Sequence, residues 1–145
     1  MKVIVLLSAA ILVAGCAHGT RPEAAANARH QDRGEEARLA AALAGRTAGA
    51  PQDCLSEWDL GTQTPYGSDV ILFRDRLDQV IYVNRPPVAC PGLAYGMAIK
   101  VQTPMSRLCR GDLVTVFDPV SGMATGGCSL GAFTPYRRAA PPKKH

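Results

Sequence analysis

The segment from residue 70 to residue 83, VILFRDRLDQVIYV, contains two apolar runs separated by a mostly charged stretch. Short runs of β-branched and aromatic residues on either side of a polar segment predict two strands joined as a hairpin. Each run is apolar at every position rather than at alternate positions, so we expect both faces of these strands to be buried. The segment therefore predicts a β fold with this hairpin in its interior.

Further strand patterns surround this hairpin, near residues 55–60, 98–103, 113–117 and 131–136. In the second of them Ile99 and Val101 alternate with Lys100 and Gln102, which is typical of a strand with one buried face. Residues 52–138 thus contain five to six short strands, and we assign them to one β domain. We expect a mainly β fold, a small antiparallel barrel or sandwich.

The first fifteen residues have the pattern of a secretion signal. Lys2 precedes an apolar run over residues 3–13, and two small residues follow before Cys16. The run is too short for a membrane span, which needs about 20 apolar residues. Residues 12–16, LVAGC, resemble the lipobox of bacterial lipoproteins, in which the cysteine receives diacylglycerol and cleavage falls just before it. The resemblance implies a signal peptide over residues 1–15 and a covalent lipid on Cys16.

The same resemblance implies a location. Acylation contributes about 0.8 kcal/mol per buried methylene, and two or more chains give stable anchoring in membrane lipid. In such lipoproteins an aspartate directly after the acylated cysteine is a signal for inner-membrane retention, and this chain has Ala17 there. We therefore expect an anchor in the outer membrane, with the domain in the periplasm.

The segments on either side of the β domain are expected to be unfolded. Residues 16–51 are rich in Ala, Arg, Glu and Gly and lack aromatic residues, which predicts a flexible tether after the lipidated cysteine. Within it, Leu39, Ala42 and Leu43 have helical spacing, so residues 31–46 are expected to form at most a transient helix. Residues 139–145 form a basic tail that we expect to be frayed.

Once Cys16 is acylated, four cysteines remain, Cys54, Cys90, Cys109 and Cys128. In an oxidising compartment they predict two disulfides, each contributing about 3 kcal/mol. Three pairings are possible, and we favour Cys54 with Cys90 and Cys109 with Cys128, because the second pair flanks a predicted strand and turn. Zinc is disfavoured because no Cys-x-x-Cys spacing is present. We expect no metal, and no cofactor other than the lipid.

The positions of the histidines argue against catalysis. His18, His30 and His145 all lie outside residues 52–138, whereas nucleophile activation by imidazole needs a ring within the domain. We therefore assign no catalytic residue and lean against an enzyme. The carboxylates left for acid and base chemistry are Glu57, Asp59, Asp69, Asp112 and Asp118. The last two stand where turn formation alone favours aspartate.

The charge distribution argues against nucleic acid as a partner. The whole chain has a net charge of +4, but residues 52–138 contain eight basic and eight acidic residues. No Gly-rich loop with the spacing of a phosphate site is present either. Tyr66 and Tyr95 stand beside glycines in loop-like stretches, and we take them as candidate binding residues, since exposed aromatic rings offer stacking surfaces.

Short sequence motifs near the cysteines show a second resemblance. They are VIYVNR (80–85), CPGL (90–93), LCRGD (108–112), CSLG (128–131) and FTPY (133–136). They resemble an uncharacterised four-cysteine family of secreted or lipid-anchored bacterial proteins, a domain of unknown function. The resemblance implies an exported four-cysteine domain and no particular activity.

These features together predict a membrane-anchored periplasmic lipoprotein. We expect its domain to be a non-enzymatic module that binds an envelope protein, peptidoglycan or lipid through its loops, or has a structural role. One alternative is a carboxylate-based hydrolase of envelope glycans. Another is a small inhibitor of periplasmic enzymes, because loops held rigid by disulfides bind with little ordering cost.

Overall fold

The computed structural model describes residues 22–94, 96–103 and 105–139, with side chains described from residue 32 onward. One helix, α1 (Pro22–Leu43), precedes a set of strands and a single 3₁₀ turn, η1 (Glu57–Asp59). The strands are β1 (Arg46–Ala48), β2 (Cys54–Ser56), β3 (Leu60–Tyr66), β4 (Val70–Asp75), β5 (Val80–Asn84), β6 (Ala98–Val101), β7 (Arg107–Cys109), β8 (Leu113–Phe117), β9 (Ala124–Ser129) and β10 (Phe133–Arg138).

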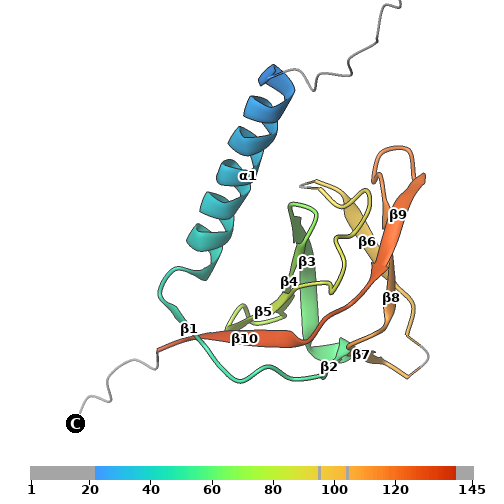
Figure 1. The fold of residues 1–145 in the computed structure, drawn as a ribbon. Coiled ribbons are helices and arrows are strands. Elements are labelled where there is room, and N and C mark those ends of the chain that lie inside the picture. Colours follow the sequence, from blue (N-terminus) through green and yellow to red (C-terminus); the bar gives the residue numbers. More distant parts are fainter. Residues whose placement is uncertain (1–21, 95, 104, 140–145) are drawn as a thin grey trace, which may run out of the picture.

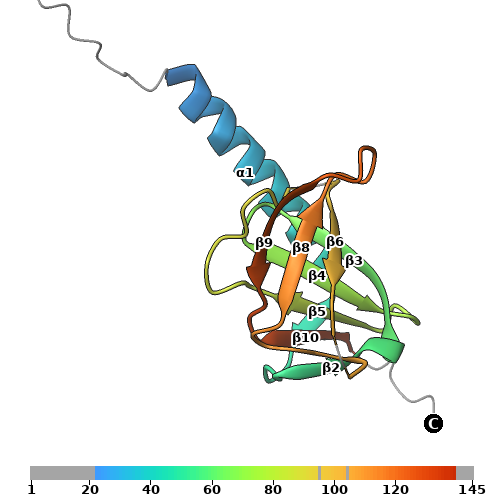
Figure 2. The same cartoon turned by 90° about the vertical axis from the view of Figure 1, so that its right-hand side faces the viewer.

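The strands form antiparallel sheets that pack in a sandwich-like arrangement (Figures 1 and 2). The largest sheet has the order β1-β10-β5-β4-β3, the second has the order β6-β8-β9, and β2 pairs with β7 alone. The expected mainly β antiparallel fold is confirmed, as a sandwich and not as a closed barrel. The predicted number of strands was too low, because β1, β3, β7 and β9 have little apolar content and were not predicted.

The predicted hairpin is confirmed as β4 and β5, which pair from Ile71 opposite Asn84 to Arg74 opposite Ile81. Both of its faces are buried, as expected. On one face Ile71 and Phe73 belong to the main core, where the Phe73 and Phe133 rings meet edge to face at 5.5 Å. On the other face Val70, Leu72, Ile81 and Val83 form a second apolar cluster. The hairpin is therefore the central layer of the molecule.

One polar side chain is fully buried among the described residues, that of Asn84 at the end of β5. Its Nδ2 donates a hydrogen bond to the carbonyl of Gly131 (2.7 Å), and its Oδ1 accepts one from the Gly131 N–H (3.0 Å). A side chain at position 131 would overlap the carbonyl of Arg85, so glycine is needed for this close approach. The amide thus joins β5 to the segment before β10.

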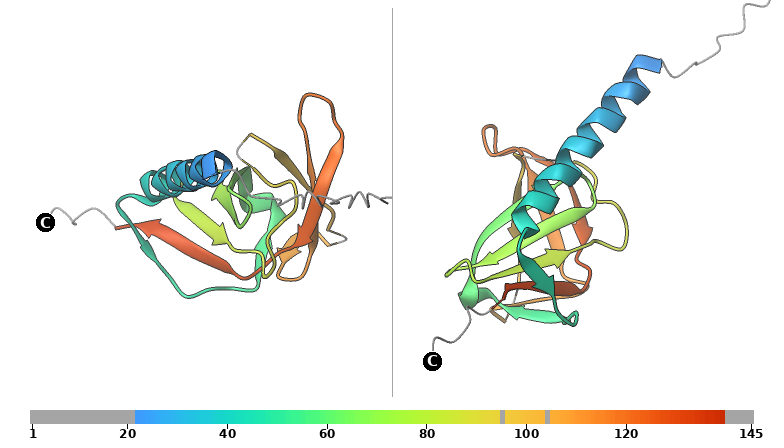
Figure 3. Two further views of the ribbon diagram at one scale, coloured as in Figure 1. Left: turned by 45° about the horizontal axis from the view of Figure 1, so that its top comes forward. Right: turned by 90° about the vertical axis from the view of Figure 1, so that its left-hand side faces the viewer.

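The expected flexible tether contains ordered structure. Helix α1 covers most of it, and β1 adds an edge strand to the largest sheet by pairing with β10 (Figure 3). Leu39, Ala42 and Leu43, the residues noted for their helical spacing, pack against the second apolar cluster. A helix that is marginal alone is stabilised when its apolar face packs on a sheet, and this packing explains the difference from the prediction.

The disulfides join Cys54 to Cys109 and Cys90 to Cys128, so the favoured pairing was wrong. Cys54 faces Cys109 directly across the β2 and β7 pair, with 4.0 Å between Cα atoms. Strand β9, which was not predicted, places Cys128 opposite Val114 and away from Cys109. The buried Cys90, in the loop after β5, is the partner that Cys128 reaches.

The proposed signal peptide, Cys16, Tyr95 and the tail beyond residue 139 lie outside the described residues. Within the described part of the chain, no helix is long and apolar enough to cross a membrane.

Candidate functional site

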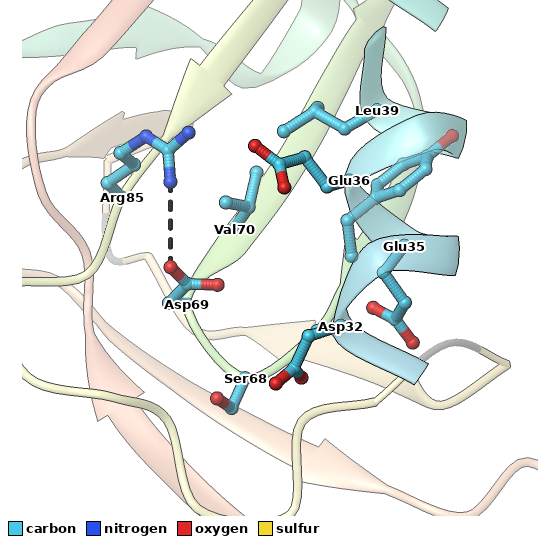
Figure 4. A pocket seen from close by; sticks show the side chains of 10 residues that line it. Asp32, Glu35, Glu36, Leu39, Ser68, Asp69, Val70 and Arg85 are labelled. Atoms are coloured by element: carbon cyan, nitrogen blue, oxygen red, sulfur yellow. Dashed lines mark ion pairs between the residues drawn. The ribbon is translucent and has the colours of Figure 1, made fainter. Parts of the chain in front are cut away.

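A cavity of about 400 Å³ lies between α1 and the turn that joins β3 to β4 (Figure 4). The helix supplies one wall and the strand ends supply the other. Its lining residues are Asp32, Glu35, Glu36, Leu39, Tyr66, Gly67, Ser68, Asp69, Val70 and Arg85. We call it the α1 cavity. It exists because α1 packs on the sheet from residue 39 onward, which leaves the preceding turn of the helix beside the β3–β4 turn.

Acidic side chains dominate the α1 cavity. Asp32, Glu35 and Glu36 come from one stretch of the helix, and Asp69 faces them from the turn (Figure 4). The single basic residue of the lining is Arg85, whose Nη1 lies 3.5 Å from Oδ2 of Asp69. This one guanidinium can balance only one of the four carboxylates. The lining keeps an excess of negative charge.

One carboxylate oxygen of the cavity is buried without a hydrogen-bond partner, Oε2 of Glu35. A β-carbon at Gly67 would lie 3.2 Å from this oxygen, so the turn approaches the helix closely here. Gly67 also has φ of +63°, a conformation that glycine adopts without strain. Glycine at this position therefore allows both the tight β3–β4 turn and its contact with α1.

The β3–β4 turn is held in place from the opposite side by the Cys90 loop. The N–H of Cys90 donates a hydrogen bond to the carbonyl of Ser68 (2.7 Å), and Cys90 is linked to β9 through Cys128. The turn is thus connected to the second sheet by a covalent bond and one hydrogen bond. We infer that this wall of the cavity is preorganised, since a cross-linked turn has little freedom to move.

Only one of the two candidate tyrosines lies within the described residues. Tyr66 lines the α1 cavity, and its role in binding stays a prediction. It also contacts the apolar cluster beneath α1. Tyr95 lies outside the described residues, and its assignment stays a prediction.

The candidate carboxylates are dispersed, and only Asp69 lies in the cavity. Asp112 accepts a hydrogen bond from the N–H of Cys109 (2.7 Å), and Asp118 accepts one from the N–H of Val120 (2.8 Å). The backbone hydrogen bond from Val120 holds the pKa of Asp118 below its ordinary value. The turn interpretation of these two aspartates is confirmed.

The remaining two candidates lie near the 3₁₀ turn. Glu57 accepts a hydrogen bond from the hydroxyl of Thr103 (3.2 Å), while Asp59 is exposed. Neither of them lines the α1 cavity. They therefore give no sign of a paired catalytic site.

A second cavity, of about 510 Å³, lies at the opposite end of the sheet, beside the β4–β5 turn. Arg46 is the key residue next to it: its side chain is 2% exposed and donates to the carbonyls of Asp78 (2.9 Å) and Gln79 (2.8 Å). The Asp78 carboxylate also pairs with Arg74 at 3.0 Å. These contacts hold β1 against the β4–β5 hairpin, so we interpret this end of the sheet as having a structural role.

Sequence reasoning missed the three acidic residues of α1, because they were assigned to a flexible tether. The available signal was the apolar outer face of the hairpin, which needs a cover that residues 39–43 can supply.

Among the described residues, no group of three or more His, Cys, Asp or Glu side chains is arranged to hold a metal ion. Comparisons with protein-family models, curated proteins and solved structures found no match for the chain.

Proposed function

We propose that the chain is a lipid-anchored binding module of the bacterial envelope, and that the α1 cavity receives a basic side chain of an envelope protein. The observation that supports this most directly is the lining of the cavity, four carboxylates against one guanidinium. A volume of about 400 Å³ is within the roughly 300–1,000 Å³ of small-molecule sites. A lysine or arginine side chain fits a site of this size and charge.

The arrangement of the acids on the helix supports a cationic ligand. Asp32 and Glu36 are four residues apart and Asp32 and Glu35 are three apart, so these side chains are neighbours on the helix surface. Like charges at such spacings destabilise a helix by about 0.2–0.5 kcal/mol per pair. A bound cation removes this repulsion and gives the buried oxygen of Glu35 a donor. Binding and helix stability are therefore coupled.

The first experiment measures binding of a hexalysine peptide to the purified chain by calorimetry. The paired variant Asp32→Asn/Glu36→Gln removes two charges and keeps the side-chain shapes, and Asp59→Asn removes one exposed charge away from the cavity. We expect the paired variant to bind about ten-fold more weakly or worse, since two nearby charge interactions are lost. We expect Asp59→Asn to bind as the wild type does. Equal affinity of all three proteins would refute the proposal.

The lipid anchor is tested separately by intact-mass analysis of protein extracted from bacterial membranes. We expect a chain that begins at Cys16 and carries acyl groups. A species that retains residues 1–15 without acylation would refute the anchor while leaving the binding result unaffected.

A glycan hydrolase is the second candidate, because the α1 cavity gathers several carboxylates and glycoside hydrolysis needs two, about 5–9.5 Å apart. Release of soluble fragments from purified peptidoglycan tests it. Activity that disappears in Glu35→Gln would replace the binding proposal, whereas unchanged peptidoglycan supports a non-enzymatic module.

A further inference from the structure

The turn that joins β8 to β9, residues 118–123, presents unusually exposed apolar side chains. Val120 is 95% exposed, more than any other large apolar residue that the structure describes, and Met123 is 68% exposed. Asp118 is the single charged residue between positions 118 and 128. We call residues 118–123 the β8–β9 tip. Its surface is apolar and nearly uncharged.

The backbone of the β8–β9 tip is hydrogen-bonded within itself. The N–H of Gly122 donates to the carbonyl of Asp118 (2.7 Å), and the N–H of Asp118 donates to the carbonyl of Met123 (3.0 Å). The Asp118 carboxylate accepts a hydrogen bond from the N–H of Val120 (2.8 Å). These internal bonds lower the cost of placing the tip at the boundary between water and lipid, because fewer of its backbone N–H groups depend on water.

The tip lies on the same side of the molecule as the N-terminal end of α1. In two views at right angles, both point toward the top (Figures 1 and 2). Contacts near the tip agree with this placement. Thr125, at the start of β9, lies so close to Gly92 that a β-carbon on Gly92 would be 2.7 Å from the Thr125 hydroxyl. Cys90, two residues before Gly92, donates a hydrogen bond to the carbonyl of Ser68 in the β3–β4 turn, which lies beside α1. The β4–β5 turn, with the exposed Leu77, lies at the other end, where Arg46 binds it.

The length of chain between the anchor and α1 limits how far the domain stands from the bilayer. Six residue steps separate Cys16 from Pro22, where α1 begins. A fully extended chain of this length spans about 20 Å. The N-terminal end of α1 is therefore held close to any membrane in which Cys16 is acylated, which allows the side of the molecule that carries the tip to face that membrane.

We infer that the β8–β9 tip inserts Val120 and Met123 into the surface of the bilayer that carries the Cys16 anchor; this rests on the proposed lipid anchor. The partner is the lipid surface itself, because the tip has no cation for anionic headgroups and offers two apolar side chains instead. A second point of contact fixes the orientation of the domain, which an acyl anchor alone does not. It holds the α1 cavity on the membrane-facing side.

The test uses tryptophan as a depth probe in the acylated full chain, reconstituted in phosphatidylethanolamine and phosphatidylglycerol vesicles that contain brominated lipid. Trp58 is the one native tryptophan and is replaced by phenylalanine in every variant. The probes are Val120→Trp and Met123→Trp, and the matched control is Leu77→Trp, whose native side chain is 75% exposed on the opposite turn. Far-UV circular dichroism verifies that all three variants are folded.

We expect brominated lipid to reduce the fluorescence of the two tip probes about two-fold or more, and to leave the Leu77→Trp probe unchanged. Equal quenching of the tip probes and the control, or no quenching of any probe in acylated protein, would overturn the inference and leave the anchor standing. Intact mass is recorded on the same samples. A mass without acyl groups would overturn the proposed anchor, and the inference with it.

Discussion

The buried Asn84 gives a sharp test of how the β5 strand is joined to β10. Substituting Asn84→Ala removes two hydrogen bonds to Gly131, of 2.7 and 3.0 Å, and leaves the N–H and the carbonyl of a buried glycine without these partners. A buried polar group left unsatisfied costs about 1–3 kcal/mol. With two such groups, we expect the free energy of unfolding to fall by about 2–4 kcal/mol.

The variant Asn84→Asp separates hydrogen bonding from volume. Its carboxylate keeps an acceptor for the Gly131 N–H but loses the donor to the Gly131 carbonyl, and it buries a charge. We expect it to be less stable than Asn84→Ala at pH 7. Burial raises the pKa of a carboxyl, and its protonated form regains a donor. The loss in free energy of unfolding relative to the wild type is therefore smallest below about pH 3.9, the ordinary aspartate pKa. It increases as pH rises through the raised pKa of the folded state.

Urea unfolding followed by circular dichroism measures these effects, with unchanged m-values showing that only stability differs. The control is Gln63→Ala, on an exposed position of β3, for which we expect a change within about 0.5 kcal/mol. An Asn84→Ala protein as stable as this control would refute the claim that the amide joins the strands.

Three further predictions concern a disulfide, a turn and the helix. Replacing both Cys90 and Cys128 by alanine should lower the free energy of unfolding by about 4 kcal/mol, from the chain entropy of a 38-residue loop, as read by urea unfolding; a change below about 1 kcal/mol would contradict this. By NMR titration, the pKa of Asp118 should lie below 3.8, so its stabilising contribution is complete above that pH and is lost as pH falls through the lowered pKa; Asp118→Asn should remove this dependence. Leu39→Ala together with Leu43→Ala should cost about 2 kcal/mol or more and expose α1 to limited proteolysis; an equally resistant helix would show that these residues do not hold it.

Local patterns predicted the elements that carry their own apolar signal. The β4–β5 hairpin and the strand with Ile99 and Val101 have runs or alternations that are visible without any partner. Strand β9 has no such signal. Its glycines are there because Gly126 meets the backbone of Pro91, where a β-carbon would overlap the Pro91 carbonyl. That contact is between segments far apart in the chain, so the sequence around β9 does not reveal it.

The same limit explains the partial view of the candidate site. Tyr66 was noted from the glycine beside it, and Asp69 was noted as a carboxylate of the predicted domain. The acids of α1 were not, because that helix depends on packing that intrinsic helix propensity does not encode. The predicted disulfide pairing was wrong for a related reason. Cys54 meets Cys109 through the pairing of two three-residue strands, which are too short to have a recognisable sequence pattern.

The place of β10 in the largest sheet has a consequence for the order of folding. β10 is the last strand that the structure describes, yet it lies between β1 and β5, and it pairs with both. A nascent chain that lacks residues 133–138 therefore has a gap in the sheet and no partner for β1. Pairing between the two ends of a chain is slow to form and comes late in synthesis. The largest sheet is therefore complete only after residues 133–138 have been synthesised and have paired with β1 and β5.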